Sequence, residues 1–307
     1  MWLQKLGKGN WLIVLLIGAG LLFQGCSGND GDEYDPFAKL TEDVATIENY
    51  LSENNIDAEI DSASGIFYTI HKQGGGYKTI SGIDVTTNFQ GWTLDGVEFV
   101  NNFTGSPVEA TLGDPSTYSP GHTSGVTIGL SIMQEGDSAT IYVPSPYGYQ
   151  NKTYDDVPPN SILVYNVKFE DIPKLDEDYE KIDQYILDKN MNAEIQPSYG
   201  VRYVVHREGN GVSPKPGAVV TTHYQGELLD GTIFDASYDS GIPLDFTYGN
   251  GELIVGFEMG VSQLHENDSA TIFIPSIYGY AGQAQGEIPA NSVLVFGLDI
   301  IRITNIN

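Results

Sequence analysis

The chain has 307 residues, enough for about two domains of roughly 100 to 200 residues each. Its 14 Lys and Arg residues stand against 41 Asp and Glu residues, so that the formal net charge is −27. Nucleic acids and anionic lipid surfaces require basic patches, and the acidic balance therefore argues against both as partners.

The first 25 residues have the pattern of a secretory signal peptide. Lys5 and Lys8 precede an apolar run over 11–23, and Gln24, Gly25 and Cys26 follow this run. A membrane-spanning helix is the alternative interpretation, but such a helix needs about 20 apolar residues and the run has 13. Cys26 is the only cysteine of the chain and therefore has no intramolecular disulfide partner.

The position of Cys26 resembles the lipobox of bacterial lipoproteins, whose cysteine becomes the lipidated first residue of the mature chain. The resemblance implies that residues 1–25 are removed and that acyl chains on Cys26 anchor the protein to a membrane of the cell envelope. Residues 26–42, with the acidic stretch SGNDGDE, are then expected to form a tether. Similar stretches mark surface-exported lipoproteins of Bacteroidetes, so we expect the outer membrane, at its periplasmic or surface face.

The remainder of the chain is an internal repeat. Residues 47–76 and 182–211 align without a gap at 11 of 30 identical positions, and residues 133–149 and 264–280 align at 11 of 17. The offset falls from 135 to 131 between these blocks, so the first copy carries extra residues around LGDPSTYSPGHTSG. We therefore expect two copies of one structural unit, over 43–172 and 178–307.

Each copy begins with a short amphipathic helix and continues as strands. The apolar residues at helical spacing are Val44, Ile47 and Leu51 in the first copy and Tyr179, Ile182 and Ile186 in the second. A period of two follows in VVTTHYQG, SATIFIP and SVLVFGLDIIRI, which are separated by Gly, Pro and Asn-Gly turn signals. The pattern predicts an α+β unit, a mainly antiparallel sheet with one short helix over about 253–263, and a short join over 171–178.

Four segments of the second copy follow one another in the order of a known family. They read VTTHYQGELLDGTIFDAS, PLDFTYGNGELIVGFEMGV, YGYAG and IPANSVLVFGLDII. From about Gly200 to Asn307 the copy resembles FKBP-type peptidyl-prolyl cis-trans isomerases. The resemblance implies two tandem FKBP-like domains, each an antiparallel half-barrel sheet around a short helix. It also implies proline-containing polypeptides as substrates, and neither a cofactor nor a metal.

The resemblance assigns a site to the second copy. The resemblance implies that Asp235 hydrogen-bonds Tyr224 and that the Tyr280 hydroxyl and the Ile254 N–H donate to the substrate. The remaining residues expected around the substrate are Phe234, Leu244, Phe246, Glu252 with its backbone carbonyl, Leu253, Phe257, Ile288 and Phe296. A purely structural role is the alternative for aromatic residues at alternate strand positions. Asp235 is more telling, because a carboxylate directly after a buried Phe is costly unless it is paired.

The first copy keeps the framework of the second but lacks its polar pair. It retains the segments LDG, PYGY and VPPNSILVY. Phe89 and Val100 replace Tyr224 and Asp235, and Val126 stands at the floor position of the cavity. Losing both partners of a buried polar pair is less costly than losing one. We expect a copy that folds but isomerises poorly; peptide binding, substrate positioning and spacing from the membrane are alternative roles for it.

For the whole chain the sequence favours a lipid-anchored isomerase that assists the folding of exported proteins. A non-catalytic peptide-binding or chaperone module and a structural envelope component are the competing hypotheses. Tyr224, Asp235, Ile254 and Tyr280 favour the enzyme. Two differences from the family favour the module: Phe257 stands where the family usually has tryptophan, and Ala284 or Gln285 stands where many relatives carry a histidine or a bulky residue at the outer rim. The helices ahead of each sheet are too short for the long dimer-forming stalks of some relatives, which favours a monomer.

Overall fold

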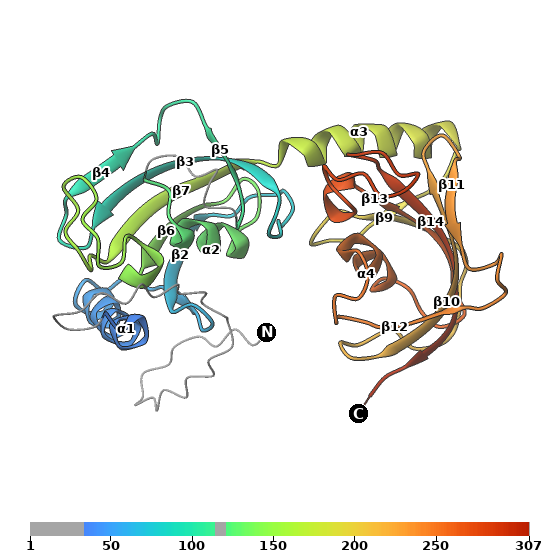
Figure 1. Cartoon of the computed structure of the whole chain (residues 1–307), viewed down its shortest axis with the longest axis horizontal. Helices are drawn as coiled ribbons and strands as arrows, with labels where there is room; N and C mark the ends of the chain where they lie inside the picture. The colour runs from blue at the N-terminus through green and yellow to red at the C-terminus, as the bar shows by residue number, and fades with distance from the viewer. Residues whose placement is uncertain (1–33, 114–120, 307) are drawn as a thin grey trace. The chain divides into compact units, whose positions relative to one another are not determined.

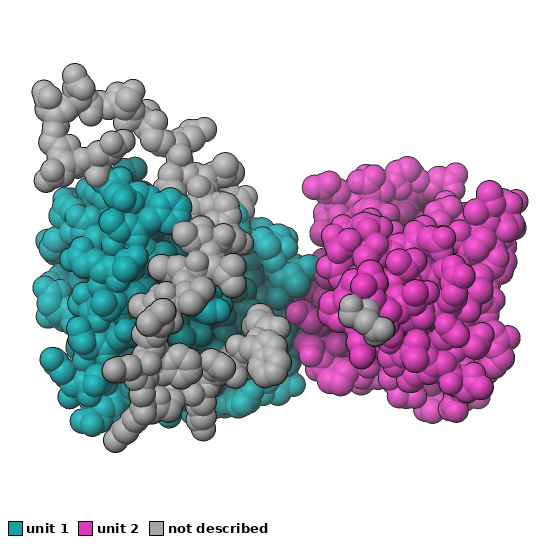
Figure 2. All heavy atoms as spheres, turned by 90° about the horizontal axis from the view of Figure 1, so that it is seen from below, with its two compact units in different colours: residues 1–171 teal, residues 172–307 magenta. Residues whose placement is uncertain are grey.

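The computed structural model describes residues 34–113 and 121–306 (Figure 1). The signal peptide expected over 1–25, Cys26 and the first part of the expected tether lie outside these residues. The chain divides into two compact units, with the boundary between Asp171 and Ile172 (Figure 2). Each unit holds an antiparallel sheet and helices, which confirms the α+β class. No helix in the described ranges combines the length and the apolar character needed to cross a bilayer.

The first unit places a helix ahead of a seven-stranded antiparallel sheet. Its helices are α1 (Pro36–Glu53), α2 (Ser124–Ile132) and the 3-10 turn η2 (Ser145–Tyr147). Its strands are β1 (Glu59–Asp61), β2 (Ile66–Lys72), β3 (Asp84–Thr93), β4 (Glu98–Asn101), β5 (Val108–Thr111), β6 (Ser138–Val143) and β7 (Leu163–Asp171). The sheet order is β1-β2-β6-β7-β3-β4, and β5 also pairs with β3.

The second unit repeats the first element by element. Its helices are α3 (Pro173–Asp188), α4 (Val255–Val261) and the 3-10 turn η3 (Ser276–Tyr278). Its strands are β8 (Glu194–Ile195), β9 (Arg202–Arg207), β10 (Val219–Leu228), β11 (Ile233–Ala236), β12 (Leu244–Thr247), β13 (Ser269–Ile274) and β14 (Leu294–Thr304). The order β11-β10-β14-β13-β9-β8, with β12 on β10, is that of the first sheet.

The two leading helices begin earlier than the sequence analysis expects. The Asp35 carboxylate caps α1 by accepting hydrogen bonds from the N–H groups of Phe37 (2.9 Å) and Ala38 (3.2 Å). Residues 36–42, expected in the tether, are therefore the first turns of α1. α3 begins at a proline, which suits the first helical position because an N–H there has no intrahelical partner. Most of the join expected over 171–178 is helical for this reason.

Helices pack on both faces of the first sheet, because successive residues of a strand point to opposite faces. On β6, Ile141 lies directly under α2, where a Cβ added to Gly129 would come within 2.2 Å of it. The next residue, Tyr142, points the other way and shares a core cluster with Ile47 and Leu51 of α1. The period-two pattern of SATIYV thus places one side chain against α2 and the next against α1.

The second sheet is built in the same way. A Cβ added to Gly256 of α4 would come within 2.2 Å of Ile274 on β13, so the helix lies almost on the strand. Phe273, the preceding residue of β13, faces α3, and its ring centroid lies 5.9 Å from that of Tyr185. Figure 1 shows α4 within the curve of its sheet. The site described next lies between the N-terminal end of α4 and the sheet.

Candidate functional site

A cavity of about 650 Å³ lies in the second unit. Eleven of the twelve residues assigned to the site from the sequence line it: Tyr224, Phe234, Asp235, Leu244, Glu252, Leu253, Ile254, Phe257, Tyr280, Ile288 and Phe296. They come from β10, β11, β12, β14, α4 and the loops that follow η3 and precede α4. Three further lining residues, Gln285, Gly286 and Glu287, belong to the loop before Ile288.

Phe257 of α4 forms the centre of an aromatic group below the cavity. Its ring stands edge-on to Phe296 of β14, with ring centroids 5.1 Å apart and an interplanar angle of 89°. Phe246 of β12 is edge-on to Phe257 at 5.8 Å but is not among the lining residues, and it is only 3% exposed. Phe246 thus belongs to the aromatic group below the cavity, and its assignment to the substrate site stays a prediction.

One wall of the cavity depends on a glycine. Phe234 of β11 stands edge-on to Phe296, with ring centroids 5.6 Å apart. Both rings lie over Gly226 of β10, where an added Cβ would come within 2.5 Å of Phe234 and 2.8 Å of Phe296. Such distances are too short for any side chain, so the glycine of the YQG segment is required for the two rings to meet.

The Tyr224–Asp235 pair joins β10 to β11. The Tyr224 hydroxyl donates a hydrogen bond to Asp235 Oδ2 at 2.5 Å. The Tyr224 ring is edge-on to Phe257, with centroids 6.5 Å apart. Burial, then the hydrogen bond to Asp235 and its negative charge, raise the pKa of Tyr224 to about 12. The phenol therefore keeps its proton at neutral pH and Asp235 holds it in one orientation.

Two further polar groups reach the cavity from the ends of short helical elements. Ile254 is the N-cap residue of α4, with φ −57° and ψ 138°, and N–H groups at a helix start have no intrahelical acceptor. The preceding loop is tied to α4 by Glu258, whose carboxylate accepts from the Gly249 N–H at 2.9 Å. Tyr280 follows η3, lines the cavity and is 36% exposed.

The rim loop supplies three lining residues that are not among the twelve site residues assigned from the sequence. Gln285 and Ile288 exchange two backbone hydrogen bonds of 2.9 Å, which close a tight turn and bring Gly286 and Glu287 to the cavity. Gly286 has a φ of +56°, a conformation that favours glycine. The QGEI segment contains this turn signal, but the signal does not indicate which surface the turn meets.

In the first unit, several of the described residues at the corresponding positions are buried. Tyr165, at the position of Phe296, is 0% exposed, and its hydroxyl donates to the Gly121 carbonyl at 2.9 Å. Phe89 is equally buried and its ring centroid lies 5.5 Å from that of His122. Burial lowers the pKa of His122 to about 4. Val100 pairs with Gly91 as Asp235 pairs with Gly226, so the register confirms that a valine has replaced the carboxylate.

Comparison with known proteins also finds two copies of one domain in the chain. A model of the family described as FKBP-type peptidyl-prolyl cis-trans isomerase matches residues 76–170 and 211–301. The chain is 41% identical over 106 residues to "Peptidyl-prolyl cis-trans isomerase Fkbp12" of Drosophila melanogaster, a match that covers 34% of the chain and 98% of the relative. It is 28% identical over 186 residues to "FKBP-type peptidyl-prolyl cis-trans isomerase FkpA" of Aeromonas hydrophila, covering 58% of the chain and 66% of the relative.

A longer relative and a solved structure complete the comparison. The chain is 26% identical over 219 residues to "Peptidyl-prolyl cis-trans isomerase FKBP9" of Mus musculus, covering 66% of the chain but only 34% of that relative. The chain thus spans about a third of the length of this mammalian protein. The crystal structure of FkpA from Escherichia coli is 28% identical to the chain, with a TM-score of 0.37. The match covers 43% of the chain and 62% of the FkpA chain.

We predict that Asp235→Asn lowers the pKa of Tyr224 from about 12 toward its ordinary value of 10.0, because the amide removes the carboxylate charge while burial persists. NMR titration with ring-labelled tyrosine measures this pKa, and Tyr224→Phe assigns the signal. The pKa of Tyr224 is higher in the folded state than in the unfolded state. The stability that this phenol contributes is therefore complete below pH 10 and is lost as the pH rises toward 12.

The matched control for this titration is Asp245→Asn. Asp245 of β12 accepts a hydrogen bond from Thr221, which lies on β10 like Tyr224. Among the described residues, Asp245 makes no hydrogen bond to Tyr224 itself. The Tyr224 pKa is expected to stay near 12 in this variant. An equal shift in both variants, or none in Asp235→Asn, contradicts the assignment of the shift to Asp235.

Proposed function

Since the chain belongs to the FKBP-type peptidyl-prolyl cis-trans isomerase family, we propose that it catalyses cis-trans isomerisation of X-Pro bonds in polypeptides, mainly through its second unit. One observation carries the proposal: the second unit has an open cavity that contains the hydrogen-bonded Tyr224–Asp235 pair, whereas the first unit has buried side chains in its place. The proposed substrates are proline-containing segments of exported proteins during folding.

The reaction requires no nucleophile and no metal ion. Rotation about an X-Pro bond must overcome a barrier of about 18–20 kcal/mol, which arises from amide resonance. Resonance places negative charge on the carbonyl oxygen, and water stabilises that charge in the planar ground state. A cavity lined by aromatic rings removes this water. The planar amide therefore loses more stabilisation than the twisted amide, and the barrier between them falls. Catalysis of this kind is differential binding.

The described residues suit distinct parts of that task. Phe234, Phe257 and Phe296 form an apolar wall and floor for a proline ring. The Ile254 N–H and the Tyr280 hydroxyl are donors that can hold a carbonyl of the substrate while the amide twists. The Tyr224–Asp235 pair keeps the polar side of the cavity rigid, because the carboxylate fixes the phenol by a charge-assisted hydrogen bond.

The proposal predicts that Asp235→Val, which copies the residue of the first unit, lowers kcat/KM for a Leu-Pro or Phe-Pro peptide by about tenfold or more, because a hydrogen bond to a charged group is lost. A protease-coupled or NMR exchange assay of the purified chain measures this rate constant, and circular dichroism verifies the fold. Val100→Ala is the matched control at the equivalent position of the first unit, and we expect it to leave kcat/KM unchanged.

The outcomes of this assay separate the candidate functions. Full activity of Asp235→Val, or a comparable loss in Val100→Ala, rules out the second unit as the main catalyst. No acceleration by the unsubstituted chain supports the non-catalytic peptide-binding module in place of the enzyme. Peptide affinity measured by calorimetry then tests that module directly.

We also propose that Cys26 is lipidated and holds the protein to the cell envelope, on the observation that it directly follows the apolar run over 11–23 and two further residues. Metabolic labelling with an alkyne analogue of palmitate is expected to label the chain, and Cys26→Ser is expected to abolish the label and release the protein from the membrane fraction. A chain that carries no label, or a Cys26→Ser variant that keeps it, contradicts the anchor.

A further inference from the structure

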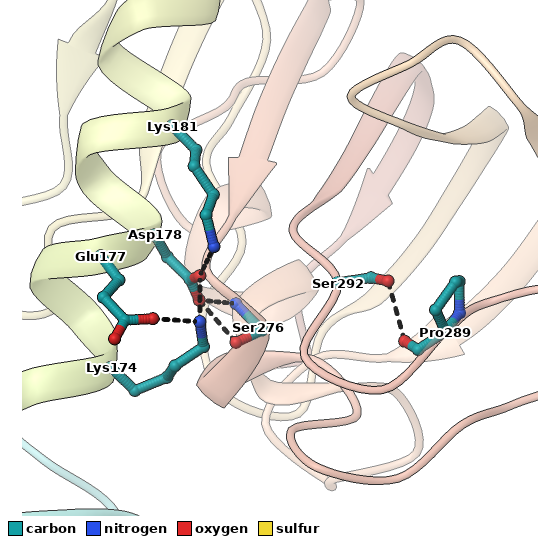
Figure 3. A network of polar contacts seen from close by, with 7 residues as sticks. All are labelled: Lys174, Glu177, Asp178, Lys181, Ser276, Pro289 and Ser292. Carbon is teal, nitrogen blue, oxygen red and sulfur yellow. Dashed lines mark hydrogen bonds and ion pairs between the residues drawn. The ribbon is translucent and has the colours of Figure 1, made fainter.

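A buried carboxylate fastens α3 to η3 in the second unit. Asp178 of α3 is 0% exposed, and its Oδ2 accepts hydrogen bonds from the backbone N–H of Ser276 at 2.7 Å and from its hydroxyl at 2.5 Å. Lys174 Nζ and Lys181 Nζ lie 3.1 and 3.5 Å from Oδ1 (Figure 3). A buried charge is costly unless it is paired and hydrogen-bonded, so this arrangement specifies how η3 lies against α3.

Ser276 in turn holds the chain on both sides of Tyr280. Its carbonyl accepts hydrogen bonds from the N–H of Gly279 at 3.0 Å and from the N–H of Ala281 at 2.8 Å. The Ala281 carbonyl accepts from Asn291 at 2.7 Å, which ties the same turn to the segment after Ile288. The backbone of Tyr280 is therefore fixed relative to Ser276, and Ser276 is fixed relative to α3.

The first unit contains the same arrangement of hydrogen bonds. Asp43 Oδ2 accepts from the N–H and hydroxyl of Ser145 at 2.8 and 2.6 Å, and Lys39 Nζ lies 2.9 Å from Asp43 Oδ1. The tyrosine that corresponds to Tyr280 is Tyr149, which stacks on Tyr154 with ring centroids 4.2 Å apart. The arrangement is thus part of the repeated fold, and in the second copy it leads to Tyr280, which lines the cavity.

From this geometry we propose that Asp178 is a positioning residue for isomerisation: it acts through Ser276 to hold the Tyr280 hydroxyl at the cavity. The proposal rests on the proposed function of the second unit. It makes α3, which lies outside the family-matched segment 211–301, a working part of the isomerase unit. Asp178 itself lies among Ser276 and two lysines and does not line the cavity.

The test uses the full chain and three substitutions. Asp178→Ala is expected to lower kcat about tenfold and to leave KM within about twofold, because the donor from Tyr280 acts in the twisted state. Asp178→Asn, whose amide oxygen still accepts both hydrogen bonds from Ser276, is expected to lose less than about threefold. Asp43→Ala removes the same contacts from the first unit and is expected to leave kcat and KM unchanged.

A double-mutant cycle with Tyr280→Phe separates positioning from general destabilisation. If Asp178 acts through the Tyr280 hydroxyl, Asp178→Ala lowers kcat by less than about twofold in the Tyr280→Phe background. A further tenfold loss there overturns the proposal, and so does an equal loss of activity in Asp43→Ala. If Asp178→Ala does not fold, Ser276→Ala and its counterpart Ser145→Ala take the places of Asp178→Ala and Asp43→Ala, with a loss of about threefold expected in the first only.

Hydrogen exchange gives a readout that does not depend on enzymatic activity. The amides of Gly279 and Ala281 are expected to exchange faster in Asp178→Ala than in the unsubstituted chain, and at an unchanged rate in Asp43→Ala. Unchanged exchange in Asp178→Ala overturns the positioning role whether or not the chain is an isomerase. Faster exchange in a chain without isomerase activity overturns the proposed function, and with it the catalytic part of this inference.

Discussion

The close approach of α4 to β13 is the constraint on which the site depends. Gly256 and Gly260 have no side chains, and Cβ atoms added there would come within 2.2 Å of Ile274 and 2.8 Å of Ile272. The helix therefore lies directly on the strand, and its N-terminal end, with Ile254 and Phe257, is held at a defined distance from the sheet. A larger residue at either glycine would lift the helix and separate the floor of the cavity from its walls.

The two units share this frame and differ in what fills the space above it. Gly125 and Gly129 bring α2 as close to β6 in the first unit. There, the buried hydroxyl of Tyr165 finds its acceptor in the Gly121 carbonyl, which satisfies the requirement that a buried polar group be paired. In the second unit Phe296 has no hydroxyl and the space stays open. The two units thus keep the same sheet order and differ in the side chains at equivalent positions.

The repeat and the α+β class can be predicted from the sequence because periodicity reports which residues share a face. Most of the cavity residues follow from the resemblance to the family, whose motifs keep their order along the chain. Depth is harder to predict: alternation does not show that Phe246 of β12 packs edge-on against Phe257 and is not among the residues that line the cavity. The start of α1 was missed although Asp35 and Pro36 are a cap signal, because the surrounding acidic composition is typical of a tether.

Other features could not be predicted because they join segments far apart in the chain. The Asp178–Ser276 contact spans 98 residues and the Tyr165–Gly121 contact spans 44. No local pattern of Asp, Ser or Tyr distinguishes such partners from exposed polar residues. The same holds for the rim, where the QGEI segment indicates a turn but not the surface that it meets.

The central claim, that the second unit alone offers a working site, is tested most directly by mapping a Leu-Pro peptide on the full chain by backbone amide NMR. The account predicts shift changes at Tyr224, Ile254 and Phe257, cis-trans exchange of the bound peptide, and no changes around Phe89 and Tyr165. Shift changes centred on the first unit, or exchange that persists when the second cavity remains unperturbed, would contradict it.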